Sequence, residues 1–266
     1  MRQTGPMGSR LAAAAATSGA LALVHAAPSA AVLGTFAQRP PTAVPGGWCR
    51  WRWPGSAGDP GALALTIDDG PAPATTPRTL DLLDCYGMRA TFFVVGTEVD
   101  RHPELVGEIR RRGHGLGVHG YQHRHHLLRS PAWVHADTGR AAASVSAATG
   151  ATPRWYRPPY GQLTSGTVAA ARRHGMQVVL WSRWGREFAE RSAGPVVDRL
   201  RPGLIPGAVL LVHDSDRFAR PGTAAITHRV LGSLAAELER RQLVSVLLDD
   251  LAVMHVPDRS SEVVPA

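Results

Sequence analysis

Two hydrophobic patterns alternate along the middle of the chain. Short apolar runs are typical of buried β-strands, whereas longer stretches with apolar residues three and four positions apart predict amphipathic helices. The predicted strands cover residues 63–67, 91–95, 116–119, 155–157, 178–182, 209–213 and 244–248. The predicted helices cover residues 77–86, 103–112, 131–149, 164–174, 196–201 and 224–241, several of them with proline in the first turn or glycine after the last.

This alternation predicts an α/β fold in which helices cover a parallel sheet. The chain contains about seven strand–helix units, so a closed eight-stranded barrel would need one strand that the pattern does not reveal. In α/β barrels the functional groups gather at the carboxyl ends of the strands. Residues that directly follow the predicted strands are therefore the candidates for chemistry.

The first 60 residues differ in composition from the rest of the chain. Arg2 and Arg10 precede an alanine-rich stretch at 11–27 and small residues at 29–31, an order that resembles a signal peptide. Polar residues interrupt the apolar stretch, so an uncleaved surface helix or a misannotated start is the alternative. A cleaved leader would make the protein secreted or envelope-associated, an uncleaved one could associate with a membrane surface, and a chain without one would be cytoplasmic.

Residues 38–60 are rich in proline, glycine and tryptophan, which predicts a linker. Its tryptophans, Trp48, Trp51 and Trp53, are expected to dock on the domain rather than on an envelope surface. The length of the chain is consistent with one domain. We expect a leader and linker at 1–60, a catalytic domain at 61–252 and a polar tail at 253–266, in a monomeric protein.

Composition excludes several classes of function. The net charge of the 266-residue chain is +8, yet no lysine occurs and every one of its 29 basic side chains is arginine. A Schiff-base lysine and a P-loop lysine are therefore excluded. The arginines are scattered and form no basic stripe interleaved with aromatic residues, so no nucleic-acid partner is expected. Attraction to an anionic cell envelope fits the charge at least as well.

Cysteine carries little information in this chain. Cys49 and Cys85 form neither a disulfide framework nor a zinc-binding spacing. Two unpaired thiols are favoured over a single bridge.

Two carboxylates and two histidines form the candidate site. Asp68 and Asp69 end an apolar strand, where adjacent side chains point in opposite directions, so that one can bind a metal while the other handles a proton. His119 and His123 are four residues apart, a spacing that lets both imidazoles face one ion from a helical turn or a tight loop. Asp69 and these two histidines would form a three-ligand site with an open position, which is the layout of catalytic zinc.

Five short segments occur in order at or just after predicted strand ends: TIDDGP at 66–71, HGYQH at 119–123, WYRPPYG at 155–161, WSRWGREF at 181–188 and LVHD at 211–214. Together they resemble the signatures of the NodB-type polysaccharide deacetylases, carbohydrate esterase family 4. One segment alone would be weak support, because Asp-Asp-Gly-Pro is also a good turn. Five segments in the family order favour the family over five independent turns and loops. The resemblance spans roughly residues 62–248.

The resemblance implies a distorted (β/α) barrel with seven strands that removes acetyl groups from a glycan. Asp68 would be the general base, held ionised by Arg157, and His213 would protonate the departing amine. Glu187 stands where the family has an Asp that raises the pKa of this histidine. The backbone N–H of Tyr160 would help to bind the oxyanion.

One divalent ion, expected to be zinc from the ligand types, would be bound by Asp69, His119 and His123. The substrate would be an acetylated glycan. The remaining substrate-binding candidates, which would contact the sugar or wall an acetyl pocket, are Tyr160, Pro158, Trp184, Phe188 and Leu211.

The sequence departs from the family pattern at three positions. Glu187 is one methylene longer than the usual Asp, Phe188 lacks the indole N–H of the usual Trp, and Gly120 lacks the hydroxyl of the usual Ser or Thr. Three hypotheses therefore remain open. The first is a metal-dependent deacetylase acting on N-acetyl, or less often O-acetyl, groups of an envelope or extracellular polysaccharide. The others are a small-molecule amidohydrolase on the same scaffold and a non-catalytic glycan-binding relic.

Overall fold

Nine strands form one sheet in the computed structural model, which describes residues 49–53 and 61–254. The strands lie in the order β1-β6-β5-β4-β3-β2-β8-β7, with β9 beside β2, and each ladder is parallel. Their bounds are β1 (Cys49–Arg50), β2 (Ala62–Asp68), β3 (Thr91–Val94), β4 (Gly115–Val118), β5 (Trp155–Tyr156), β6 (Gln177–Val179), β7 (Arg183–Trp184), β8 (Val209–His213) and β9 (Val244–Val246).

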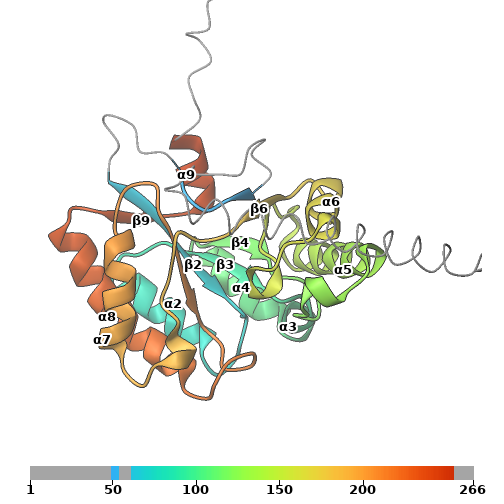
Figure 1. Cartoon of the computed structure of the whole chain (residues 1–266). Helices are drawn as coiled ribbons and strands as arrows, with labels where there is room; N and C mark the ends of the chain where they lie inside the picture. Colours follow the sequence, from blue (N-terminus) through green and yellow to red (C-terminus); the bar gives the residue numbers. More distant parts are fainter. Residues whose placement is uncertain (1–48, 54–60, 255–266) are drawn as a thin grey trace, which may run out of the picture.

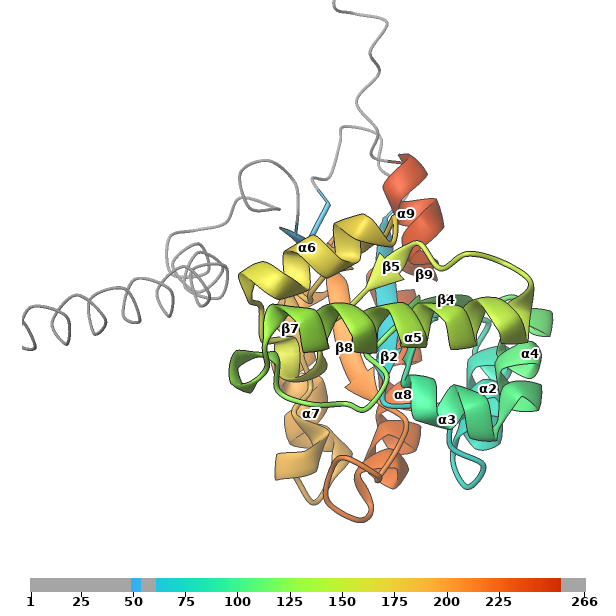
Figure 2. The ribbon, with the colours of Figure 1, turned by 90° about the vertical axis from the view of Figure 1, so that its right-hand side faces the viewer.

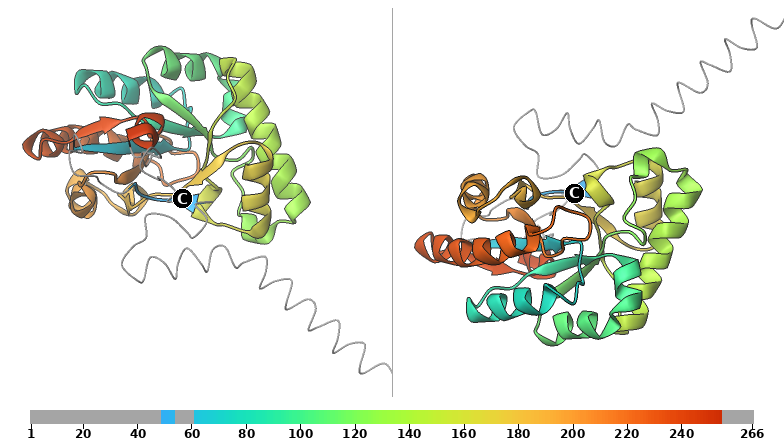
Figure 3. Two further views of the ribbon diagram at one scale, coloured as in Figure 1. Left: turned by 90° about the horizontal axis from the view of Figure 1, so that it is seen from above. Right: turned by 90° about the horizontal axis from the view of Figure 1, so that it is seen from below.

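Helices lie on the outside of the curled sheet, as the views in Figures 1, 2 and 3 show. The long helix α5 packs against α6, α3 and α4, and α8 packs against α7 and α2. The α-helices are α2 (Thr76–Cys85), α3 (Gly96–Arg101), α4 (Pro103–Arg111), α5 (Pro131–Thr149), α6 (Ser165–Arg173), α7 (Ala193–Leu200), α8 (Thr223–Arg240) and α9 (Leu248–Met254). Short 3-10 turns are η1 (His126–Leu128), η2 (Pro159–Gly161), η3 (Glu187–Ala189) and η4 (Arg201–Gly203).

The predicted α/β class and the parallel sheet are confirmed, and each of the seven predicted strands is present. The two further strands, β1 and β7, are only two residues long, so they leave no periodic pattern in the sequence. The pattern also did not reveal the short helices α3 and α9. The apolar run predicted as a strand at 244–248 ends as β9 at Val246, and α9 begins at Leu248.

Strand β2 positions the site. It pairs with β8 over residues 64–68, with β9 over residues 62–64 and with β3 over residues 66–68, and its seven residues are all buried. A strand that is covered on both faces must be apolar throughout, which explains its uninterrupted hydrophobic run. Its last residue, Asp68, is paired in register with His213 at the end of β8.

A short N-terminal segment, residues 49–53, contacts the sheet at two places. Strand β1 pairs with β6, while Arg52 forms an antiparallel bridge with Ala208, the residue before β8. The N–H of Trp53 donates to the carbonyl of Gly207 at 2.8 Å. The side chains of Trp51 and Trp53 are 1% and 3% exposed. These two tryptophans therefore dock on the domain, and this part of the predicted linker belongs to the sheet.

The two cysteines are free thiols, as the sequence predicted. Cys49 is buried in β1, and Cys85 is exposed at the end of α2. None of the described helices has the length and apolar character needed to cross a membrane. The alanine-rich leader, Trp48 and the tail after residue 254 lie outside the described residues.

Candidate metal centre and active site

Asp68 and Asp69 line the same cavity at the carboxyl end of β2. The sequence predicted opposite directions for two adjacent strand residues, which is wrong here because Asp69 no longer has a strand backbone. Its φ is 77°, in the left-handed region, so its side chain is turned back toward the cavity that Asp68 faces. Left-handed backbone at a non-glycine residue is costly and is often found at functional sites.

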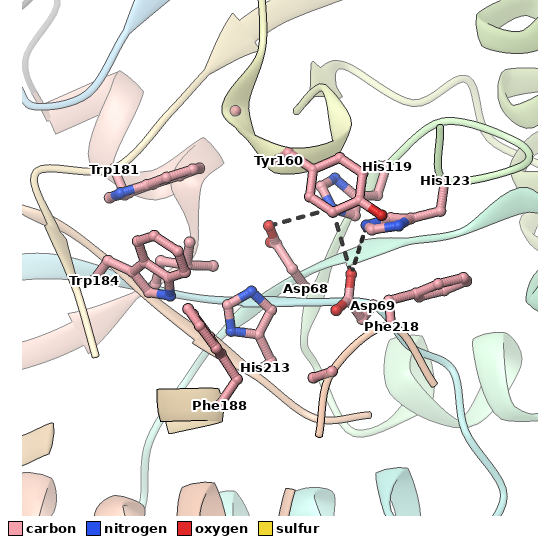
Figure 4. A pocket seen from close by; sticks show the side chains of 13 residues that line it. Asp68, Asp69, His119, His123, Tyr160, Trp181, Trp184, Phe188, His213 and Phe218 are labelled. Carbon is pink, nitrogen blue, oxygen red and sulfur yellow. Dashed lines mark ion pairs between the residues drawn. The ribbon is translucent and has the colours of Figure 1, made fainter. Parts of the chain in front are cut away.

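His119 and His123 approach Asp69 from the loop after β4, and not from a helix. Asp69 Oδ1 lies 3.1 Å from His123 Nε2 and 3.5 Å from His119 Nε2. The backbone of His123 is also left-handed, with φ 52°. The structure thus brings the three predicted ligands together, with their ligand atoms all within 4.8 Å of one another (Figure 4).

The second nitrogen of His119 fixes the orientation of its ring. His119 Nδ1–H donates to the carbonyl oxygen of Arg157 at 2.8 Å, which leaves Nε2 facing Asp69. Burial alone would raise the pKa of Asp69, but the imidazoles of His119 and His123 hold this pKa well below its usual range. Asp69 Oδ1 is buried and accepts no hydrogen bond within the described residues. A buried carboxylate oxygen that faces two imidazole nitrogens fits a divalent ion of the zinc type.

Arg157 is completely buried behind Asp68. Its Nη1 donates to Asp68 Oδ1 at 2.7 Å and to Thr66 Oγ1 at 2.8 Å. Its Nε and Nη2 donate to the carbonyl oxygens of Val179 and Leu180 at 3.0 and 2.9 Å. The guanidinium is therefore fixed by four hydrogen bonds, and it presents one charged donor to the carboxylate.

His213 lies across the cavity from the histidine pair, on β8 (Figure 4). Its Nδ1 is 3.3 Å from Oε2 of the buried Glu187. Burial alone would lower the pKa of His213, but Glu187 and, more weakly, the charges of Asp69 and Asp68 raise it to about 9. The longer Glu187 therefore reaches the histidine from the turn η3, where the family pattern has an Asp.

The cavity has a volume of about 250 Å³ and one largely apolar wall. Tyr160, Trp184, Phe188 and Leu211 line it, as predicted. Pro158 does not line it and is buried instead, so its assignment as a substrate contact was wrong. The sequence reasoning missed four other lining residues: Gly161, Trp181, Phe218 and Ala219.

The sequence could have indicated one of these four lining residues but not another. Trp181 opens one of the five short segments and is the second residue after β6, so its place at a strand end was a usable signal. Phe218 lies in the loop between β8 and α8, outside every segment, and no pattern pointed to it. Its ring stacks on that of His123, with centroids 4.1 Å apart and an interplanar angle of 21°.

The neighbouring histidines have other roles. His126 is buried, and its Nδ1 lies 2.9 Å from Thr167 Oγ1. His125 stacks on Tyr160 with centroids 3.7 Å apart. Neither belongs to the ligand cluster, as the four-residue spacing of His119 and His123 predicted.

Comparison with known proteins gives the family. The family model described as polysaccharide deacetylase matches residues 55–179. A chitooligosaccharide deacetylase from Bradyrhizobium sp. (strain ANU 289) is 35% identical over 187 residues, which cover 68% of this chain and 85% of that protein. The chain belongs to the NodB-type polysaccharide deacetylases. Another relative in this family, the peptidoglycan-N-acetylglucosamine deacetylase PgdA of Listeria monocytogenes, is 34% identical over 57% of this chain, but the match spans only 32% of PgdA.

Solved structures agree with this assignment. The family 4 carbohydrate esterase from Streptomyces lividans, in complex with acetate, is 28% identical with a TM-score of 0.65, covering 71% of this chain and 93% of that one. A family pseudoenzyme from Bacillus anthracis has a TM-score of 0.67 over 76% of this chain and 68% of its own, at 21% identity, which shows the shared fold alone. The fold therefore occurs in proteins with and without activity, so the fold alone does not determine whether this chain is an active deacetylase.

Proposed function

We propose that this protein is a metal-dependent deacetylase that hydrolyses N-acetyl groups on an envelope or extracellular polysaccharide. One observation carries the proposal. Asp69, His119 and His123 converge within 4.8 Å of one another, and Asp68 and His213 line the same cavity. A ligand triad beside an acid and a base is what hydrolysis of an acetamide requires.

Asp69 Oδ1 and the Nε2 atoms of both histidines would hold the ion. A bound divalent ion supplies Lewis-acid chemistry, because it polarises a carbonyl oxygen and makes water more acidic. Zinc is our expectation, since imidazole and carboxylate ligands suit it.

Asp68 would act as the general base. Its Oδ1 is held by Arg157, and its Oδ2 lies 3.6 Å from His119 Nε2. Because Arg157 holds Oδ1, Oδ2 is left on the side of His119, where it can accept a proton from the water that attacks the acetyl carbon. Without that proton transfer, the tetrahedral product of the attack would revert.

His213 would act as the general acid. Its pKa of about 9 keeps it protonated at neutral pH, opposite Glu187. When the C–N bond breaks, the imidazolium gives its proton to the amine nitrogen, which leaves as the free amino group of the sugar. The acetyl carbon leaves as acetate.

Tyr160 would help in two ways. Its backbone N–H is the candidate oxyanion donor, at a residue held in a left-handed conformation with φ 59°. Its ring, 49% exposed, stands at the mouth of the cavity beside the half-buried Trp181 and Trp184. Exposed aromatic rings offer flat apolar faces for sugar rings, which favours a glycan over a small molecule that would need an enclosed pocket.

A non-catalytic relic is disfavoured by the two ionic pairs. The Arg157–Asp68 pair is fully buried, and Glu187 is buried where it meets His213. Burying charges is costly, and a protein that only binds glycans gains nothing from a base and an acid on opposite sides of the bound group. We also propose that the protein is extracytoplasmic, because an envelope substrate lies outside the cytoplasm.

The test is acetate release from a panel of N-acetylated and O-acetylated glycans by the purified full-length protein, with and without a chelator. We expect release from at least one glycan, loss of activity with the chelator, and recovery when zinc is restored. Release that persists in the metal-free protein would contradict the metal-dependent mechanism. A protein that binds the glycans but releases no acetate from any of them would support the relic instead.

A further inference from the structure

Arginine is concentrated around the cavity. The loops that follow β4, β5, β6 and β8, residues 119–130, 157–164, 180–192 and 214–222, contain eight arginines and four acidic residues. None of these acids is free at the cavity mouth. Glu187 and Asp214 are buried, Glu190 pairs with Arg199, and Asp216 accepts hydrogen bonds from the backbone N–H groups of Gly222 and Ala224.

Arg186 lies on one side of the cavity. Its guanidinium carbon is 5.9 Å from the ring centroid of Trp184, which lines the cavity. Its backbone is left-handed, with φ 57°, and the next residue is Glu187, the partner of His213. The exposed Arg186 forms no ion pair with any described residue, so its charge is available to a ligand.

Arg124 lies near the other side. It is exposed, directly follows His123, and forms no ion pair among residues 49–53 and 61–254. The rings of its two chain neighbours, His123 and His125, have centroids 4.7 and 3.7 Å from that of Tyr160, so the backbone of Arg124 lies beside this ring. Tyr160 and Trp184 lie on either side of Asp68 in Figure 4, so Arg124 and Arg186 flank the reacting position.

Arg217 adds charge at a third point of the mouth. Its guanidinium carbon is 5.7 Å from the ring centroid of Phe218. Arg217 is paired with Glu98, but Glu98 is shared with Arg101, so this group of three keeps a net positive charge. The charge of Arg217 is partly neutralised, whereas Arg124 and Arg186, next to the aromatic rings that line the cavity, form no ion pair among the described residues.

We propose that the substrate is an anionic glycan. Arg124 and Arg186 would bind carboxylates on the sugars next to the acetylated residue. The proposal rests on the deacetylase function proposed above and narrows its substrate. Guanidinium groups bind carboxylates with charge-assisted hydrogen bonds, and a positive rim raises the local concentration of anionic ligands. The carboxylate could belong to a muramic-type lactyl ether or to a uronic acid, whereas a neutral chitin-type chain offers the two arginines no partner.

The effect should appear in KM and not in kcat. Arg124 and Arg186 would contact sugars beside the scissile group, so their contacts are the same in the ground state and the transition state. Contacts of this kind change substrate affinity alone. They should also weaken as salt screens them.

The test compares three N-acetylated oligosaccharides of equal length: a neutral one, one with free lactyl carboxylates and one with uronic acids. We expect KM about tenfold lower for at least one charged oligosaccharide than for the neutral one at low salt, and a smaller ratio at high salt. The charged oligosaccharide that is preferred identifies the source of the carboxylate. Equal KM values for all three would overturn the proposal.

Arg124→Gln and Arg186→Gln should each reduce the preference for the charged substrate about threefold. The matched control is Arg172→Gln, because Arg172 is exposed near the end of α6, which leads into the start of β6 and so lies away from the cavity. This control should leave both substrates unaffected. A loss of preference as large in the control would show only a general charge effect and would overturn the assignment of the two residues.

Equilibrium binding of the same oligosaccharides to the Asp68→Asn variant separates this proposal from the proposed function. If no oligosaccharide is deacetylated but the charged ones bind more tightly, the function fails and the anionic preference stands. If all are deacetylated and bound alike, the function stands and the anionic preference fails.

Discussion

The ring of Phe218 stacks on the ring of His123 at a centroid distance of 4.1 Å. Metal-binding histidines usually donate their second nitrogen to a hydrogen-bond acceptor, which fixes the ring. His119 does so toward the carbonyl of Arg157, but His123 Nδ1 has no partner among the described residues. The stacked ring of Phe218 on one side and the tilted ring of Tyr160, 4.7 Å away, are therefore the contacts that orient the His123 ring.

We expect Phe218→Leu to weaken zinc affinity by about tenfold, the low end of the effect of removing a contact that orients a ligand. Phe218→Tyr keeps the ring and should keep the affinity. Competition with a chromophoric chelator measures both variants without requiring turnover. Equal affinity of Phe218→Leu and the natural protein would show that the stack does not orient the ligand.

Replacing each acid of the Asp-Asp pair should separate metal binding from proton transfer. Asp68→Asn should retain the metal and lose turnover by at least about a hundredfold, because an amide cannot accept the proton. Asp69→Ala should lose both the metal and turnover, because it removes a ligand. Metal content by atomic absorption and acetate release check the pair, and normal turnover by Asp68→Asn would show that another group is the base.

Glu187→Gln should narrow the pH range of activity on the alkaline side. Burial favours neutral His213, and Glu187 is the main group that raises its pKa to about 9. A general acid acts while protonated, so activity is present below this pKa and is lost as pH rises through it. Without the carboxylate, the alkaline limb of the kcat profile should move about one unit or more toward lower pH.

Glu187→Asp is the matched control for this prediction. It keeps the charge but shortens the side chain by one methylene, and Glu187 Oε2 is already 3.3 Å from His213 Nδ1. Its alkaline limb should therefore lie between those of the natural protein and Glu187→Gln. Identical alkaline limbs of the kcat profile in all three proteins would mean that His213 is not the acid whose titration limits activity.

Arg157→Met should destabilise the fold by about 3–5 kcal/mol, because it leaves the Asp68 carboxylate buried and unpaired. Adding Asp68→Asn to this variant should recover part of the loss, since the second change removes the buried charge. Urea unfolding of the two single variants and the double variant measures the coupling. Additive losses would show that the two side chains do not interact energetically.

Trp53→Ala should cost about 3–5 kcal/mol of unfolding free energy, as expected for a buried tryptophan. Trp53 is 3% exposed and meets Trp155 edge-on with centroids 6.1 Å apart. Trp133→Ala, at a partly exposed position on α5, is the control and should cost less. Equal losses would argue against a structural role for the N-terminal segment.

The sequence was most informative where a hydrophobic pattern repeats or where two residues are close in the chain. The strand pattern located the carboxyl ends of the strands, and the four-residue spacing of His119 and His123 selected these two among the four histidines of residues 119–126. The direction of Asp69 was missed because it depends on a left-handed φ, which Asp adopts more readily than most residues but which the strand pattern did not assign to it. Phe218 and Pro158 were missed or misplaced for a related reason. Loop conformation decides which neighbours of a motif reach the cavity, and tertiary contacts set that conformation.

The pairing of Cys49 with Val178 has a consequence for how the molecule is made. Among the described strands β1 is synthesised first, and its partner β6 lies in the second half of the chain, so this ladder cannot form until most of the polypeptide exists. Contacts between such distant positions slow folding.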